Sequence, residues 1–150
     1  YSGTVAAAIE AAFLGLPSIA VSLHLRDDIE TDYAGAAGHA VQTIRQILAA
    51  GLNKGQCVSV NLPALSAGQK PRGIRVVRQC TRAWGDTYDR RKDPKGRDYY
   101  WNSSIFKLET PDEDSDVAAV RDGYITVTPL QFDLTDYDVL QQWAAKPWRL

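Results

Sequence analysis

The sequence contains no methionine, only two cysteines and two histidines, and no long apolar run. No stretch approaches the about 18 consecutive apolar residues that a membrane-spanning helix needs. Cys57 and Cys80 lie far apart in the chain, so neither a zinc-ligand spacing nor a disulfide framework is expected. A formal net charge of −1 predicts no bulk attraction to nucleic acid or to an anionic membrane. The 150 residues suffice for one globular domain with a sizeable core.

Common catalytic signatures are absent as well. Neither a Gly-x-Ser-x-Gly elbow nor a P-loop occurs. Asp27 and Asp28 form a carboxylate pair, but adjacent acids in a charged loop are more often a solvated face than a metal site. His24 follows a predicted strand, where α/β proteins place ligands, and one histidine there is weak evidence.

The most informative stretch is the first 23 residues, which predict a loop, a helix over 5–14, a turn and a strand over 18–23. The first N–H groups of a helix have no partner within it, and the helix dipole is positive there. Ser2, Gly3 and Thr4 add two hydroxyls and a flexible backbone at this point. Either this turn only caps the helix, as such residues commonly do, or it also binds a phosphate.

Helix and strand patterns alternate up to Pro63. A second helix is predicted over 33–50 and a second strand over 57–63. This alternation is typical of an α/β protein with a parallel sheet. Each cysteine falls in a predicted strand, which favours reduced core thiols in a cytoplasmic protein. The chain starts without an initiator methionine and its first helix has no strand before it, so we expect a fragment.

The second half of the chain is different in character. A strand is predicted over 73–80. A long hairpin follows, with arms near 84–92 and 97–101 joined by a type I turn at 93–96. A helical turn is predicted over 117–122. A further strand over 124–129 and a final helix with a capping box from Thr135 to Asp138 complete the chain. The basic and aromatic residues of the hairpin could bind single-stranded nucleic acid, but interleaved aspartates favour an interface or an exposed hairpin.

Eight short blocks, in order along the chain, resemble the C-terminal part of the SurE family, the stationary-phase survival proteins. The blocks are YSGTVAAA (1–8), LGLPSIAVS (14–22), VSVNLP (58–63), GIRVVR (73–78), DPKGRDYYW (93–101), SDVAAV (115–120), GYITVTPL (123–130) and DLT (133–135). The resemblance implies a Rossmann-like, three-layer α/β core with a parallel sheet, a projecting C-terminal hairpin and a terminal helix. One domain over 1–150 is expected, with core residues 1–80, a hairpin over 81–103, and a return to the core and terminal helix over 104–150.

The same resemblance implies a function. Family members are metal-dependent 5′- and 3′-nucleotidases acting on nucleoside monophosphates, which places Ser2, Gly3 and Thr4 at the substrate phosphate. It also implies homodimers or homotetramers that exchange the hairpin (84–101) and the C-terminal helix. No membrane partner and no nucleic acid as main partner are expected.

One departure from the family concerns the metal. The resemblance implies one divalent cation, Mg²⁺ or Mn²⁺, held mainly by an Asn-Asp-Asp-Gly motif, a serine and an asparagine that these 150 residues do not contain. We therefore expect a nucleotidase as the full-length protein, with this segment alone binding no metal and having negligible turnover. The alternative is a non-catalytic binding or oligomerisation module derived from the same fold.

Overall fold

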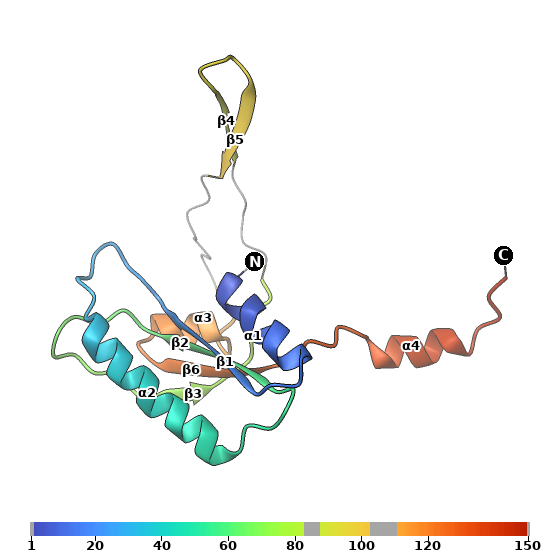
Figure 1. The fold of residues 1–150 in the computed structure, drawn as a ribbon, viewed down its shortest axis with the longest axis horizontal. Helices are drawn as coiled ribbons and strands as arrows, with labels where there is room; N and C mark the ends of the chain where they lie inside the picture. Colours follow the sequence, from blue (N-terminus) through green and yellow to red (C-terminus); the bar gives the residue numbers. More distant parts are fainter. Residues whose placement is uncertain (1, 83–87, 103–110, 150) are drawn as a thin grey trace.

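The computed structural model describes residues 2–82, 88–102 and 111–149 (Figure 1). Along the chain its elements are α1 Gly3–Phe13, β1 Ser18–Leu23, α2 Tyr33–Ala50, β2 Cys57–Leu62, β3 Ile74–Val76, β4 Tyr88–Lys92, β5 Asp98–Asn102, α3 Asp116–Arg121, β6 Ile125–Leu130 and α4 Tyr137–Ala144. The α/β class, the hairpin and the terminal helix are thus confirmed. No helix in the described ranges is long and apolar enough to span a bilayer.

The central sheet is mixed, where the sequence predicted a parallel one. Its strands lie in the order β1-β2-β6-β3, with β1 parallel to β2 and β3 parallel to β6. Strands β2 and β6 are antiparallel. A parallel return needs a crossover, usually a helix, and residues 63–73 between β2 and β3 form none. The chain therefore reverses direction after β2, and the helix–strand alternation of the first half could not show this.

One face of the sheet carries the aliphatic core. Alternate residues of β2 and β6 point to this face: Val58, Val60, Leu62, Ile125 and Val127. Helix α2 covers them, as Figure 1 shows, and contributes Ala36, Ala40 and Ile47. The sequence predicted an apolar face through Ala37, Val41, Ile44 and Leu48. The buried side is instead the adjacent row of Ala36, Ala40, Thr43 and Ile47, and Val41 and Leu48 are 47% and 56% exposed.

The opposite face of the sheet is small and polar, and α1 and α3 cover it. Its buried polar residues are Ser18, Ser59, Thr126 and Thr128. Helix α1 packs there through Ala8 and Ala12 against Ala20 and Cys57. Because these side chains are small, the backbones approach closely, and the Ser18 hydroxyl donates to the Ala8 carbonyl at 2.7 Å.

Three local predictions need correction. Helix α1 begins at Gly3 rather than residue 5, because Ser2 already caps it. Helix α4 is capped by Asp136, whose carboxylate accepts from the Val139 N–H at 3.0 Å, and not by Thr135, whose N–H donates to Asp133. Strand β3 ends at Val76, so Cys80 is a buried free thiol outside any strand.

The predicted hairpin turn is confirmed. The Gly96 N–H donates to the Asp93 carbonyl at 2.9 Å, and Gly96 has a φ of 79°, which favours glycine. Strands β4 and β5 pair antiparallel from Tyr88–Asn102 to Lys92–Asp98. Residues 84–87 of the predicted arm lie outside the described residues. Both the hairpin and α4 stand apart from the sheet and its covering helices (Figure 1).

Candidate functional site

The N-terminus of α1 presents exposed donors. Ser2 caps the helix by accepting from the Val5 N–H at 3.3 Å, and Ser2, Gly3 and Thr4 are all exposed. Within the described residues, neither the Gly3 and Thr4 N–H groups nor the Thr4 hydroxyl has a hydrogen-bond partner. A side-chain carbon built on Gly3 would meet nothing within 4 Å. Packing in this chain therefore does not require a glycine there, and the space above its backbone is open.

This helix end lies toward the carboxyl ends of β1 and β2. Helix α1 leads through a short turn into β1, so its C-terminal end lies beside the starts of the strands. A side-chain carbon on Gly55, just before β2, would be 3.6 Å from the Ala12 carbonyl. The N-terminal end of α1 therefore points to the opposite edge of the sheet, where parallel strands of α/β proteins present their ligand-binding loops.

Two cavities open at that edge, between the end of β1 and α3. The first measures about 500 Å³ and is lined by Ser22, Leu23, His24, Leu25, Asn61, Asp116, Val117, Val120 and Arg121. The second measures about 1100 Å³ and also takes in Arg26, Asp27, Asp28 and Gln69. His24, Leu25, Val120 and Arg121 line both. We call the combined hollow the β1–α3 cleft.

His24 lines both cavities of this cleft and follows directly on β1. Its N–H donates to the Leu62 carbonyl at 2.8 Å, which continues the β1–β2 hydrogen bonding by one residue. Burial lowers the pKa of its imidazole, and the positive charges of Arg121 and Arg26 lower it further. The side chain is therefore a neutral donor and acceptor at pH 7.

Asp27 and Asp28 lie exposed in the loop that follows β1. Asp28 is engaged by Arg26 in a two-point contact of 2.6 and 3.0 Å, and this hydrogen bonding lowers the pKa of its carboxyl. Within the described ranges, no group of three or more His, Cys, Asp or Glu side chains could hold a metal ion. The interpretation of these acids as a solvated face is the better one.

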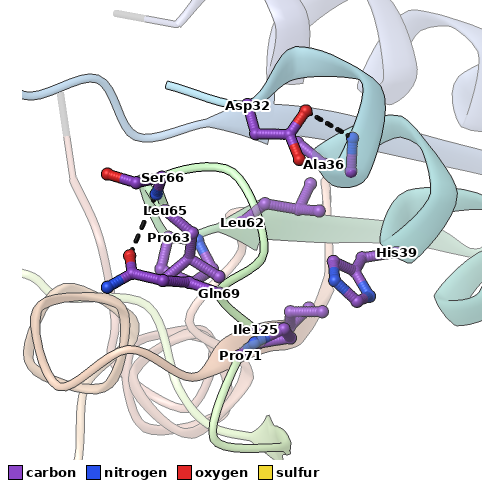
Figure 2. A pocket seen from close by; sticks show the side chains of 11 residues that line it. Asp32, Ala36, His39, Leu62, Pro63, Leu65, Ser66, Gln69, Pro71 and Ile125 are labelled. Carbon is purple, nitrogen blue, oxygen red and sulfur yellow. Dashed lines mark hydrogen bonds between the residues drawn. The ribbon is translucent and has the colours of Figure 1, made fainter. Parts of the chain in front are cut away.

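A smaller pocket lies across the sheet, between α2 and residues 62–71 (Figure 2). Its polar groups have structural roles: Asp32 caps α2 by accepting from the Gly35 N–H at 2.9 Å, and Gln69 accepts from the Ser66 N–H at 3.0 Å. His39 points into this pocket and not into the β1–α3 cleft (Figure 2).

The assignment of Ser2, Gly3 and Thr4 to a phosphate stays a prediction. The sequence pointed to these three residues as a site and provided only weak evidence for His24; His24 lines both cavities, and Ser2, Gly3 and Thr4 line neither. Sequence reasoning missed Asn61 and Arg121. Both lie inside short elements whose patterns report only packing, and no spacing signal links residue 61 to residue 121.

Comparison with known proteins agrees with this architecture. The family described as "Survival protein SurE" matches residues 1–86. A protein of Symbiobacterium thermophilum named "5'-nucleotidase SurE" is 43% identical over 146 residues, covering 95% of this chain and 56% of that protein. One of Rhodopirellula baltica with the same name is 41% identical over 150 residues, covering 100% and 57%.

A solved structure gives the same result. The crystal structure of the SurE protein from Aquifex aeolicus superposes with a TM-score of 0.74 at 36% identity, covering 95% of this chain and 56% of that one. The chain thus spans about half the length of the relatives it matches. With matching blocks along most of its length and the same fold, this chain belongs to the SurE family.

Proposed function

We propose that the complete protein carrying this chain is a phosphomonoesterase that hydrolyses nucleoside 5′- or 3′-monophosphates to nucleoside and phosphate. The observation that carries this is the open N-terminus of α1, where exposed N–H groups lie beside two hydroxyls. The names of the relatives, "5'-nucleotidase SurE", supply the substrate class.

Ser2, Gly3 and Thr4 would hold the substrate phosphate. Backbone N–H groups at a helix N-terminus donate to phosphate oxygens, and the helix dipole favours the negative charge. Ser2 accepts from Val5, so its own hydroxyl proton remains available to donate outward. The lack of a side chain on Gly3 lets the anion approach the backbone. The same donors would stabilise the charge that builds on phosphorus oxygens during hydrolysis.

The cation is a separate proposal. The described residues do not fit a divalent metal, because they hold no cluster of suitable ligands. We therefore derive no step through a cation from them and propose that ligands outside these 150 residues bind Mg²⁺ or Mn²⁺. Hydrolysis by the complete protein should stop with a chelator and return with Mn²⁺, whereas the 150-residue chain alone should show negligible turnover in either condition. Equal turnover of both proteins would contradict this division.

The first test is Gly3→Ala in the complete protein. The added methyl group meets nothing within 4 Å and alanine is the better helix former, so the Tm should stay equal or rise slightly. It would, however, occupy the space that the phosphate needs, and we expect kcat/KM for a nucleoside monophosphate to fall at least about tenfold.

Gly38→Ala is the matched control. Gly38 is an exposed glycine of α2 whose added side chain would also meet nothing within 4 Å. It should raise the Tm without changing kcat/KM. Unchanged kcat/KM in Gly3→Ala, with the Tm preserved, would contradict the proposal that the substrate phosphate binds at the N-terminus of α1.

We also propose that the protein forms a homodimer or homotetramer through the hairpin and α4. Apolar side chains on and beside α4 are exposed, with Leu134 at 93% and Trp148 at 69%. The hairpin arginines are already paired with aspartates: Arg90–Asp98 at 2.5 Å, Arg97–Asp93 at 2.7 Å and Arg91–Asp89 at 3.4 Å. Among the described residues of the hairpin, only Lys92 and Lys95 are cations outside an ion pair, and this aromatic surface with mostly paired charges fits a protein partner better than a nucleic acid.

The second candidate is a non-catalytic binding or oligomerisation module. It is favoured by the missing metal-ligand cluster in the described part of the chain, together with the exposed hairpin and α4. The chelator experiment separates the two, because a module assembles but hydrolyses nothing with or without Mn²⁺. We keep the cytoplasm as the proposed location, which the free thiols of Cys57 and Cys80 support.

A further inference from the structure

The first cavity of the β1–α3 cleft has a largely apolar wall. Leu23 ends β1, Leu25 lies in the loop after it, and Val117 and Val120 come from the inner side of α3. This cavity, of about 500 Å³, has the size of a typical small-molecule site. Apolar walls with a few polar groups at one end suit a flat aromatic ring, which stacks through its faces and hydrogen-bonds through its edge.

Arg121 is the cationic group of the cleft that has no ion-pair partner among the described residues. It is the last residue of α3, exposed, and it forms neither an ion pair nor a hydrogen bond within the part of the chain that the structure describes. By contrast, Arg26, which also lines the cleft, is engaged by Asp28 at 2.6 Å. Arg121 therefore presents a planar set of donors toward the cleft.

The other polar groups of the first cavity are partly used. Asp116 accepts from the Cys80 and Val117 N–H groups, each at 2.8 Å. Asn61 donates from Nδ2 to the Thr126 hydroxyl at 3.3 Å, which leaves its Oδ1 as an acceptor. His24 is held neutral by burial and by the neighbouring arginines, which lower its pKa.

We propose that this cleft binds the base of the substrate, that the base is a 6-oxopurine, and that Arg121 recognises it. This inference rests on the proposed nucleotidase function and names its substrate more narrowly. A 6-oxopurine offers two acceptors, O6 and N7, on one edge, which match the paired donors of a guanidinium. Adenine carries an amino group in place of O6, so a donor of the base would face a donor of the Arg121 guanidinium and no hydrogen bond could form there.

The charges around the cleft favour a base over a second phosphate. Four aspartates line it (Asp27, Asp28, Asp116 and Asp122) against two arginines (Arg26 and Arg121), and this excess of negative charge disfavours an anion. The phosphate would instead lie at the N-terminus of α1, which covers the same face of the sheet as α3 and points to the same edge. The cleft is therefore on the correct side of the sheet for the nucleoside part of one substrate.

The test is steady-state hydrolysis by the complete protein of GMP, AMP and ribose 5-phosphate, which has no base. The wild type should prefer GMP. Arg121→Ala should lower kcat/KM for GMP about 10- to 100-fold, the range for loss of a two-point base contact, and leave ribose 5-phosphate unchanged. Arg121→Lys keeps the charge but not the planar fork and should not restore GMP hydrolysis. Arg45→Ala, an exposed arginine of α2, is the matched control and should change nothing.

Equal loss for GMP and ribose 5-phosphate would overturn the proposal, because Arg121 would then act on the phosphate. The proposal would also be overturned if Arg121→Ala left kcat/KM unchanged for both substrates, or if Arg121→Lys hydrolysed GMP as well as the wild type. If the wild type hydrolyses none of the three, the nucleotidase function itself fails, and the cleft is tested separately by calorimetric titration with guanosine. Binding of guanosine that is lost in Arg121→Ala would support the base site, and absence of binding would overturn it.

Discussion

Thr128 carries a buried hydroxyl that has no hydrogen-bond partner in the described part of the chain. Its side chain is 2% exposed and faces α1 from β6, opposite Ser59 of β2. Thr126, two residues earlier on the same face, is fully buried too, but its hydroxyl accepts from Asn61 at 3.3 Å. The two threonines therefore differ in hydrogen bonding and hardly at all in burial.

Replacing each by the isosteric valine should give opposite results. Thr128→Val removes an unsatisfied hydroxyl and should raise the free energy of unfolding by about 1 kcal/mol. Thr126→Val removes the partner of Asn61 and should lower it by about 1 kcal/mol. Urea denaturation followed by circular dichroism measures both. A loss of stability in Thr128→Val would show that its hydroxyl has a partner in solution.

Among the elements, the short helix α3 depends on ion pairs in the segment that precedes it. It has six residues, and an ion network fixes the chain before it: Arg78 binds Asp112 and Asp114, each at 2.8 Å, and Arg82 binds Asp112 at 2.5 Å. Hydrogen bonds from Arg78 lower the pKa of both carboxyls. The network therefore fixes the N-terminal approach to α3, the helix whose last residue is Arg121.

This network predicts a pH-dependent contribution to stability. A carboxyl whose pKa is lower in the folded state stabilises the fold at pH values above its unfolded pKa, and the contribution is lost as the pH falls through the folded pKa. Asp112→Asn should therefore lower the Tm at pH 7, and its difference from the wild type should shrink below about pH 4. Thermal denaturation across pH 3–7 measures this.

Glu30→Gln is the control, since Glu30 is exposed and has no ion pair within the described ranges. It should leave the Tm nearly unchanged at every pH. A difference between Asp112→Asn and the wild type that stays constant from pH 7 to pH 3 would show that the ion network is not the source of the stability.

For the whole molecule, the exposed face of α4 is the part most in need of a partner. Leu140 and Trp143 lie on it, and Trp143 packs edge-to-face on Trp148 with ring centroids 6.0 Å apart. An amphipathic helix with no core beneath it gains stability only by burying this face elsewhere.

The combined variant Leu140→Asp and Trp143→Asp should shift the complete protein from a dimer or tetramer to a smaller species in sedimentation equilibrium. The two introduced carboxylates would be buried in an apolar interface, and the free-energy cost of removing them from water would outweigh the contacts that the interface gains. Gln142→Asp, on the opposite side of α4, should leave the oligomer intact. An unchanged assembly in the double variant would exclude α4 from the interface.

Much of the fold could be predicted because local signals dominate its first half. Periodicity and glycine ends located the 33–50 helix and the 18–23 strand, and the proline–glycine turn located the hairpin. The direction of the strands after β2 could not be predicted, because it depends on the path of the loop at residues 63–73, which carries no periodic pattern. The cap of α4 was misplaced by one residue because Thr135 and Asp136 are both good caps, and only their three-dimensional surroundings select between them.

The sequence by itself determined the α/β class, the two hydroxyl residues at the N-terminus of α1 and the short sequence blocks that match the SurE family. These depend on residues close together in the chain, where spacing translates directly into geometry. Only the tertiary structure decided that β6 runs against β2, that Arg78 binds Asp112 and Asp114, and that Arg121 lines a cleft with His24 and Asn61. Those pairs are separated by tens of residues, and no pattern in the chain records which distant side chains will meet when the sheet and its helices pack.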